Sequence, residues 1–205
     1  MPISYPLSLP SVRIRQIVLR GTSATSSSES PFTFQEQIQV FPGQRWSATI
    51  TLPPMKRAEA DLWTAFMLSL NGREGTFLMG DPAAAQPKGS MGGDPTVDGN
   101  SQTGNELNIM GCPNNIVGWG KKGDYIQFTT GGFNRLHMLL ADADTNGTGR
   151  TTLLLWPRLR TSPAHGEPII TTNTKGQWRL AQSYSEKTID IGANYGQSFA
   201  CVEAL

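Results

Sequence analysis

The sequence predicts a mainly β protein with one covering helix, and three observations lead to that prediction. Short apolar segments alternate with polar residues along most of the chain, as half-buried strands require. Turn-forming residues separate these segments, because 22 glycines and 14 prolines are spread over 205 residues. Only residues 56–70 have the apolar spacing of an amphipathic helix.

The first fifty residues favour strands joined by a loop and a turn. Residues 12–18 alternate loosely between apolar and polar side chains. The serine-rich segment 21–31 has no large apolar residue, and ordering it would cost about 1–2 kcal/mol per residue with little burial in return. We therefore expect a long mobile loop there. Residues 32–41 and 45–52 lie on either side of Pro42-Gly43, a turn dipeptide, and predict a hairpin.

One helix is predicted, from Lys56 to Leu70, directly after Pro53-Pro54 ends the preceding strand. Its large apolar residues fall on one face: Leu62, Trp63, Phe66, Met67 and Leu70. Asn71-Gly72 is suited to a left-handed C-terminal cap. A helix with a single apolar face has to cover a sheet, so a layered β structure is expected.

The middle of the chain changes composition sharply. Residues 80–105 are rich in Gly, Pro, Ala and Asp, which predicts a structureless arm whose residues 84–103 could be deleted with the fold intact. Four strands are then predicted, separated by turn residues, as in a small antiparallel β-barrel. These strands are 116–119, 125–128, 136–141 and 151–156.

A last set of strands runs to the end of the sequence, at 169–172, 178–180, 188–191 and 198–202. We therefore expect two units. Residues 1–79 and 164–205 form a first sheet with its helix, and residues 80–163 form an inserted arm and small barrel.

Composition excludes several classes of protein. The 17 Lys and Arg against 16 Asp and Glu give a net charge of +1, which supplies no field for nucleic acid or for anionic membranes. No segment approaches the roughly 18 apolar residues of a membrane span, and the first residues do not read as an export signal. Two cysteines make neither a disulfide framework nor a zinc site.

Catalysis requires titratable groups that are held together, and this chain has few. His137 lies in an apolar strand pattern, and His165 lies among turn residues. A thiol nucleophile, Cys112 or Cys201, would need one of these histidines within hydrogen-bonding reach. We therefore interpret both histidines and both cysteines as structural.

Three further motifs have a structural interpretation beside the functional one. Asp142-Ala-Asp144-Thr-Asn146-Gly147 resembles the start of a calcium loop, but Leu153 stands where the bidentate carboxylate should be, so we favour a hairpin turn. Neither Gly118-Trp119-Gly120 nor Gly131-Gly132 precedes a helix, so neither predicts a phosphate site. The two arginines in 156–160 are expected to face a carboxylate or a neighbouring chain.

Several motifs follow one another along the chain between residues 45 and 205. The first group is Leu52-Pro-Pro-Met55, Ala60-x-Leu-Trp63-x-Ala-Phe66 and Leu70-x-Gly72-x-x-Gly75-Thr-Phe-Leu-x-Gly80-Asp-Pro82. The second group is Gly123-Asp124-Tyr-Ile126, Leu136-His137, Gly149-x-x-Thr-Leu153, Pro157-Arg-Leu-Arg160, Gly176-Gln-Trp-Arg-Leu180 and Ser198-Phe199-Ala-x-Val-Glu203. This order resembles the distal tail proteins found at the baseplate or tail tip of long-tailed bacteriophages.

The resemblance implies a tail-tube-like β-sandwich with one flanking α-helix. It implies subunits that form a homo-oligomer, a hexameric ring in the virion tail, assembled in the host cytoplasm. Such a ring joins the tail tube protein to the baseplate hub and the receptor-binding apparatus. No enzymatic role follows, so no catalytic, cofactor-binding or metal residue is assigned, and neither sequence-specific nucleic-acid binding nor membrane insertion is expected.

The residues agree with this interpretation on separate grounds, because segments 21–31 and 80–105 would gain burial only on assembly. Two other functions remain open. A receptor- or carbohydrate-binding β module is one, favoured by the aromatic residues of the β-rich second half. A hydrolase that pairs a cysteine with a histidine is the other.

Overall fold

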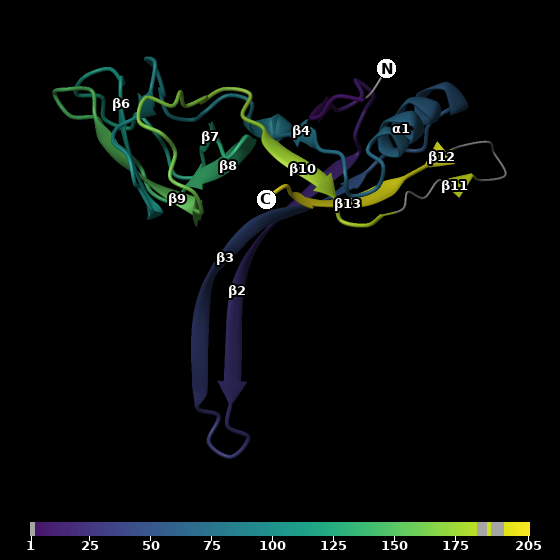
Figure 1. Ribbon diagram of the computed structural model, residues 1–205, viewed down its shortest axis with the longest axis horizontal. Coiled ribbons are helices and arrows are strands. Elements are labelled where there is room, and N and C mark those ends of the chain that lie inside the picture. Colours follow the sequence, from purple (N-terminus) through teal and green to yellow (C-terminus); the bar gives the residue numbers. More distant parts are fainter. Residues whose placement is uncertain (1–2, 184–187, 190–194) are drawn as a thin grey trace.

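The computed structural model describes residues 3–183, 188–189 and 195–205. It consists of two main β-sheets, one α-helix and a long β-hairpin that projects away from both sheets (Figure 1). The predicted fold class, a mainly β sandwich with one flanking helix, is confirmed.

The first sheet has six strands in the order β1-β4-β10-β13-β3-β2. Its strands are β1 (Leu7–Ser8), β2 (Gln16–Glu29), β3 (Glu36–Thr51), β4 (Phe77–Met79), β10 (Gly176–Leu180) and β13 (Ser198–Glu203). β1 runs parallel to β4, and the other pairs are antiparallel. Both ends of the chain therefore contribute to one sheet, whose edge strands are β1 and β2.

Helix α1 (Arg57–Ser69) packs against this sheet and begins and ends within one residue of the prediction. Trp63, Phe66 and Met67 are buried in the shared core, as expected. Asn71 has a φ of 47°, the left-handed value that ends the helix. The prediction for Leu62 was wrong, because its side chain is 55% exposed on the outer face.

The second sheet is inserted between β4 and β10 and has the strand order β5-β6-β9-β8-β7. Its strands are β5 (Thr96–Val97), β6 (Gly104–Met110), β7 (Tyr125–Thr130), β8 (Phe133–Leu139) and β9 (Thr151–Leu159). The sheet is curled rather than closed by direct pairing of its edge strands. Residues 166–170 bridge the gap, because Val97 donates to the Glu167 carbonyl (3.0 Å) and Gln127 to the Ile170 carbonyl (2.9 Å).

Most strand predictions in the second half are confirmed in type, and two are wrong. Residues 116–119 form turns, and residues 169–172 make only the isolated bridge of Ile170 to Gln127. The remaining short elements are η1 (Pro82–Ala84), β11 (Thr188–Ile189) and β12 (Tyr195–Gly196). The end of the strand predicted at 188–191 lies outside the described residues.

The segment 80–105 is packed, so the prediction of a structureless, dispensable arm was wrong. Met91 and Val97 are buried in the core of the second sheet. The buried carboxylate of Asp124 accepts hydrogen bonds from the backbone N–H groups of Lys88 (2.7 Å) and Gly89 (2.9 Å). A segment with few apolar residues is ordered here by backbone hydrogen bonds, and deleting 84–103 would remove part of the core.

Residues 21–29 of the segment 21–31 form a strand, so the prediction of a long loop there was also wrong. β2 continues to Glu29 and pairs with β3 along its whole length, from Gln16↔Thr51 to Glu29↔Glu36. The hairpin prediction placed its turn at the wrong site, since Pro42-Gly43 lies inside β3 at an irregularity in the pairing. A proline inside a strand is tolerated at such a bulge. The chain reverses instead at residues 30–35.

The two sheets meet at the base of this hairpin. The indole rings of Trp46 and Trp156 pack edge to face with their centroids 4.3 Å apart. The Trp46 Nε1 donates a hydrogen bond to the Leu136 carbonyl at 2.9 Å. Gly21 passes directly over Trp156, where a Cβ atom would lie 2.6 Å from the ring. The absence of a side chain at this position therefore lets β2 cross the junction.

Candidate functional site

The cysteines and histidines lie in separate places. Cys112 is buried in the second core and Cys201 in the first, and burial raises the pKa of these thiols to about 11 and about 12. His137 stacks on Phe128, with ring centroids 4.7 Å apart, while His165 accepts a hydrogen bond from a backbone N–H in an exposed loop. Among the contacts described, neither imidazole has a thiol partner.

Burial of His137 makes the stability of the fold depend on pH. Desolvation lowers the pKa of its imidazole from 6.5 to about 4, although the Pro157 carbonyl, 2.7 Å from Nδ1, acts in the opposite direction. Because the folded pKa lies below the unfolded one, this contribution is complete above pH 6.5 and is lost as the pH falls towards 4. The expected loss is about 3 kcal/mol.

The measurement is the free energy of unfolding from pH 7 to pH 4, by denaturant titration, for the parent chain and His137→Gln. The variant should be less stable at pH 7 but should lose less stability on acidification. Parallel pH profiles for the two chains would contradict the assignment of this pH dependence to His137.

The segment 142–147 leads into a turn at residues 147–148, and Ala143 within it forms a β-bridge with Gly120. The Asn146 side chain accepts hydrogen bonds from the backbone N–H groups of Thr148 (2.9 Å) and Arg150 (3.0 Å), as the turn interpretation predicts. Asp142 pairs with Lys121 at 2.9 Å, and Asp144 accepts from the Gly118 N–H. Within the described residues, no group of three or more His, Cys, Asp or Glu side chains could hold a metal ion.

The other motifs have structural positions as well. All five tryptophans are buried or half-buried, so they provide no exposed aromatic platform of the kind that binds sugars. Of the arginines in 156–160, Arg160 faces a carboxylate, that of Glu203, as predicted.

The surface feature that stands out is the arm, defined here as residues 21–45 of the β2–β3 hairpin. In Figure 1 it extends well beyond both sheets. The nine residues Gly21–Glu29 alone span about 30 Å at the rise of a β-strand. An isolated two-stranded hairpin is marginally stable in water, so this arm is suited to a partner surface.

The two faces of the arm differ in chemistry. Directly opposed residues of paired strands place their side chains on the same face. The register Ser27↔Ile38 and Thr25↔Val40 therefore forms an apolar face, on which Ile38 and Val40 are 60% and 72% exposed. The opposite face is polar and consists of Ser26, Ser28, Gln37 and Gln39.

The arm tip, residues 30–35, carries two phenylalanines that are almost fully solvated. Phe32 is 91% exposed and Phe34 76%. Phe34 has a φ of 54°, a left-handed conformation that costs an L-residue about 1–2 kcal/mol and that glycine adopts freely. The tip therefore presents an aromatic ring at a position where the backbone alone would favour glycine.

The total accessible surface is larger than that of a compact protein. It is 11,484 Å² for a chain of 22.3 kDa, whereas a compact monomer of this mass exposes about 9,400 Å². The excess is about 2,000 Å², as expected for a chain with a projecting element. Among the residues that the structure describes, those of the arm project from the body (Figure 1).

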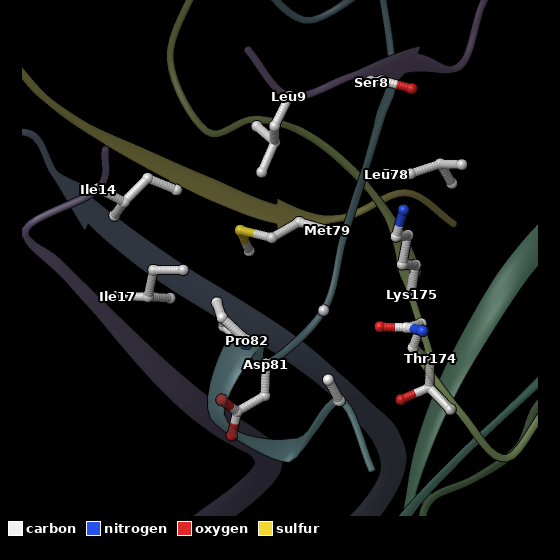
Figure 2. A pocket seen from close by; sticks show the side chains of 13 residues that line it. Ser8, Leu9, Ile14, Ile17, Leu78, Met79, Asp81, Pro82, Thr174 and Lys175 are labelled. Carbon is white, nitrogen blue, oxygen red and sulfur yellow. The ribbon is translucent and has the colours of Figure 1, made fainter. Parts of the chain in front are cut away.

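A groove lies beside β1 and β4, with a volume of about 250 Å³, and we call it the β1–β4 groove. Figure 2 shows one wall formed by apolar side chains, while the opposite wall combines polar side chains with Leu78. The apolar wall includes Leu9, Ile14, Ile17 and Met79, and the polar wall includes Thr174 and Lys175. Asp81 also lines the groove, and its carboxylate accepts the Ala83 N–H at 2.9 Å.

No protein-family model matches the chain, and no curated protein is significantly similar to it. In the part of the chain that the structure describes, no helix has the length and apolar character needed to cross a membrane.

Proposed function

We propose that this chain is a structural subunit of a long-tailed bacteriophage tail. Its copies form a homo-oligomeric ring, hexameric by the resemblance of residues 45–205, at the distal tail or baseplate. The ring connects the tail tube protein to the hub and the receptor-binding apparatus, and the subunit acts by assembly rather than by catalysis. The observation that supports this function most strongly is the projecting arm.

The surface of the arm is what supports a ring of copies. Ile38 and Val40 are exposed on the β surface of the arm, and Phe32 and Phe34 are exposed at its tip; in a protein that stays monomeric these residues would favour aggregation. A heterologous contact, in which the arm of one copy covers a different surface on the next, closes into a ring when the rotation allows it. The near-zero net charge of +1 adds little repulsion between copies.

Shortening the arm tests this function. Ser23 and Gln44 are directly paired, so replacing residues 24–43 by Asn-Gly joins them with a two-residue hairpin turn. The residues removed are exposed or, at Ser30, half-buried in the arm itself. We expect the variant to fold with the melting temperature of the parent and to be monomeric, whereas the full chain assembles.

Native mass spectrometry and light scattering of purified full-length protein give the readout. The double variant Gln37→Ala/Gln39→Ala, on the polar face, is the matched control and should assemble like the parent. A full chain that stays monomeric at every concentration tested would contradict the proposal, as would a shortened chain that still assembles.

A further inference from the structure

We propose that the β1–β4 groove is the binding site for the arm tip of a neighbouring copy, which inserts Phe32 and Phe34. This inference rests on the proposed function and deepens it, because it names the surface that the arm recognises. The arm tip of the same chain is excluded as the occupant, since the arm points away from the body (Figure 1).

The groove matches an aromatic side chain in chemistry, because one of its walls is apolar. Its volume of about 250 Å³ is smaller than the roughly 300–1,000 Å³ of drug-sized ligand sites, which favours an inserted side chain over such a ligand. Ile14 and Ile17 are half-buried and extend the apolar wall to the surface. An aromatic ring that enters an apolar pocket is the usual energetic centre of a protein interface.

The residues that flank the tip are acidic, and one wall of the groove carries a cation. Glu29 and Glu36 are directly opposed at the end of the arm, where two like charges repel each other across the strands. Lys175 is exposed on the polar wall of the groove and makes no ion pair with any described residue. Asp81, the acidic residue of the groove, keeps its charge, but its carboxylate is held at the start of η1 by the Ala83 N–H at 2.9 Å. A neighbouring tip would bring the two glutamates to this cation.

The conformation of Phe34 agrees with a role in binding. The left-handed backbone of Phe34 closes the tip turn, in which its N–H donates to the Ser30 carbonyl at 2.9 Å, and glycine would adopt this conformation with less strain than the aromatic residue found there. Replacement of Phe34 by glycine is therefore expected to leave the melting temperature unchanged or higher. It should raise the concentration needed for assembly at least about tenfold, because an aromatic anchor is lost.

Blocking the groove tests the surface that is proposed to receive the arm tip. Ser8 lines the groove with an exposed side chain, so Ser8→Trp fills it without disturbing the core. Ser11 is also exposed but is not in the lining, and Ser11→Trp is the matched control. We expect Ser8→Trp to abolish assembly and Ser11→Trp to preserve it, both with the parent melting temperature.

A cross-link tests the contact directly. The natural thiols, Cys112 and Cys201, are buried, so a cross-link between chains can be assigned to the introduced cysteines. Chains carrying Thr33→Cys are mixed with chains carrying Ser8→Cys and oxidised, which should give a covalent dimer that neither variant gives alone. The chain that carries both changes should give a ladder of covalent oligomers on a denaturing gel.

The outcomes separate the two proposals. Cross-linked mixtures together with a monomeric Ser8→Trp chain support the groove as the binding site. A parent chain that forms rings, with no cross-link and with Ser8→Trp assembling normally, overturns the groove and leaves the proposed function standing. A parent chain that is monomeric throughout and gives no cross-link overturns both.

Discussion

Replacing Trp63 by alanine is expected to lower the free energy of unfolding by about 3–5 kcal/mol, the usual cost of truncating a buried aromatic residue. Trp63 is fully buried and joins α1 to the first sheet. Its ring lies 5.8 Å from that of Phe66 on the same helix and 6.0 Å from that of Phe199 on β13. In a chain of this length, the melting temperature should fall by roughly 10 °C.

Two control variants make this result specific. Leu62→Ala changes the adjacent, exposed residue, and its melting temperature should stay close to that of the parent. Trp63→Phe keeps an aromatic ring and removes an indole N–H that has no hydrogen-bond partner among the described residues, so it should cost much less than alanine. A Trp63→Ala protein that melts within about two degrees of the parent would contradict this role.

The helix shows how far sequence periodicity could define the fold. Spacing predicted its limits and the burial of Trp63, Phe66 and Met67. It could not place Leu62, which lies at the border of the apolar stripe, because only the position of the sheet decides which border residue is covered. Predictions from periodicity were reliable where many apolar residues agreed.

The arm and the segment 80–105 were missed for a common physical reason. Both segments are poor in apolar residues, and the burial of apolar residues is the signal from which a sequence predicts an ordered backbone. Segment 21–29 is ordered by its hydrogen-bonded register with β3, and segment 80–105 by contacts such as that of Lys88 with Asp124. Lys88 and Asp124 are 36 residues apart, so no local pattern indicates their contact. The signal that was present was the strand pattern at Ile38 and Val40, which requires a paired strand nearby.

The groove could not be predicted at all. Its walls come from the ends of elements far apart in sequence, from Leu9 near the start to Lys175 before β10. The alternation of apolar residues predicts Phe32 and Phe34 as strand residues, whereas both lie in the turn at the arm tip. Surface exposure, which gives them their proposed role, depends on the tertiary structure.

Replacing Glu203 by glutamine should destabilise the junction of the two sheets by about 3–5 kcal/mol, the cost of breaking a buried ion pair. Its carboxylate accepts two hydrogen bonds from Arg160, both of 2.9 Å, and lies 3.7 Å from the Arg135 guanidinium. It also accepts the Trp46 backbone N–H at 3.2 Å. Glutamine has the same shape but carries no charge, so two arginines lose their counter-ion in a largely buried site.

Comparison with an exposed ion pair separates the effect of burial on stability from the effect of charge. Lys121 and Asp142 are also 2.9 Å apart, but their side chains are 42% and 53% exposed. Asp142→Asn should therefore leave the free energy of unfolding almost unchanged, because solvent screens an exposed pair. Equal effects of Glu203→Gln and Asp142→Asn on the free energy of unfolding would show that the junction does not depend on this carboxylate. A much larger effect at Glu203 means that one side chain, bound to β3, β8 and the end of β9, fixes the second sheet to the base of the arm.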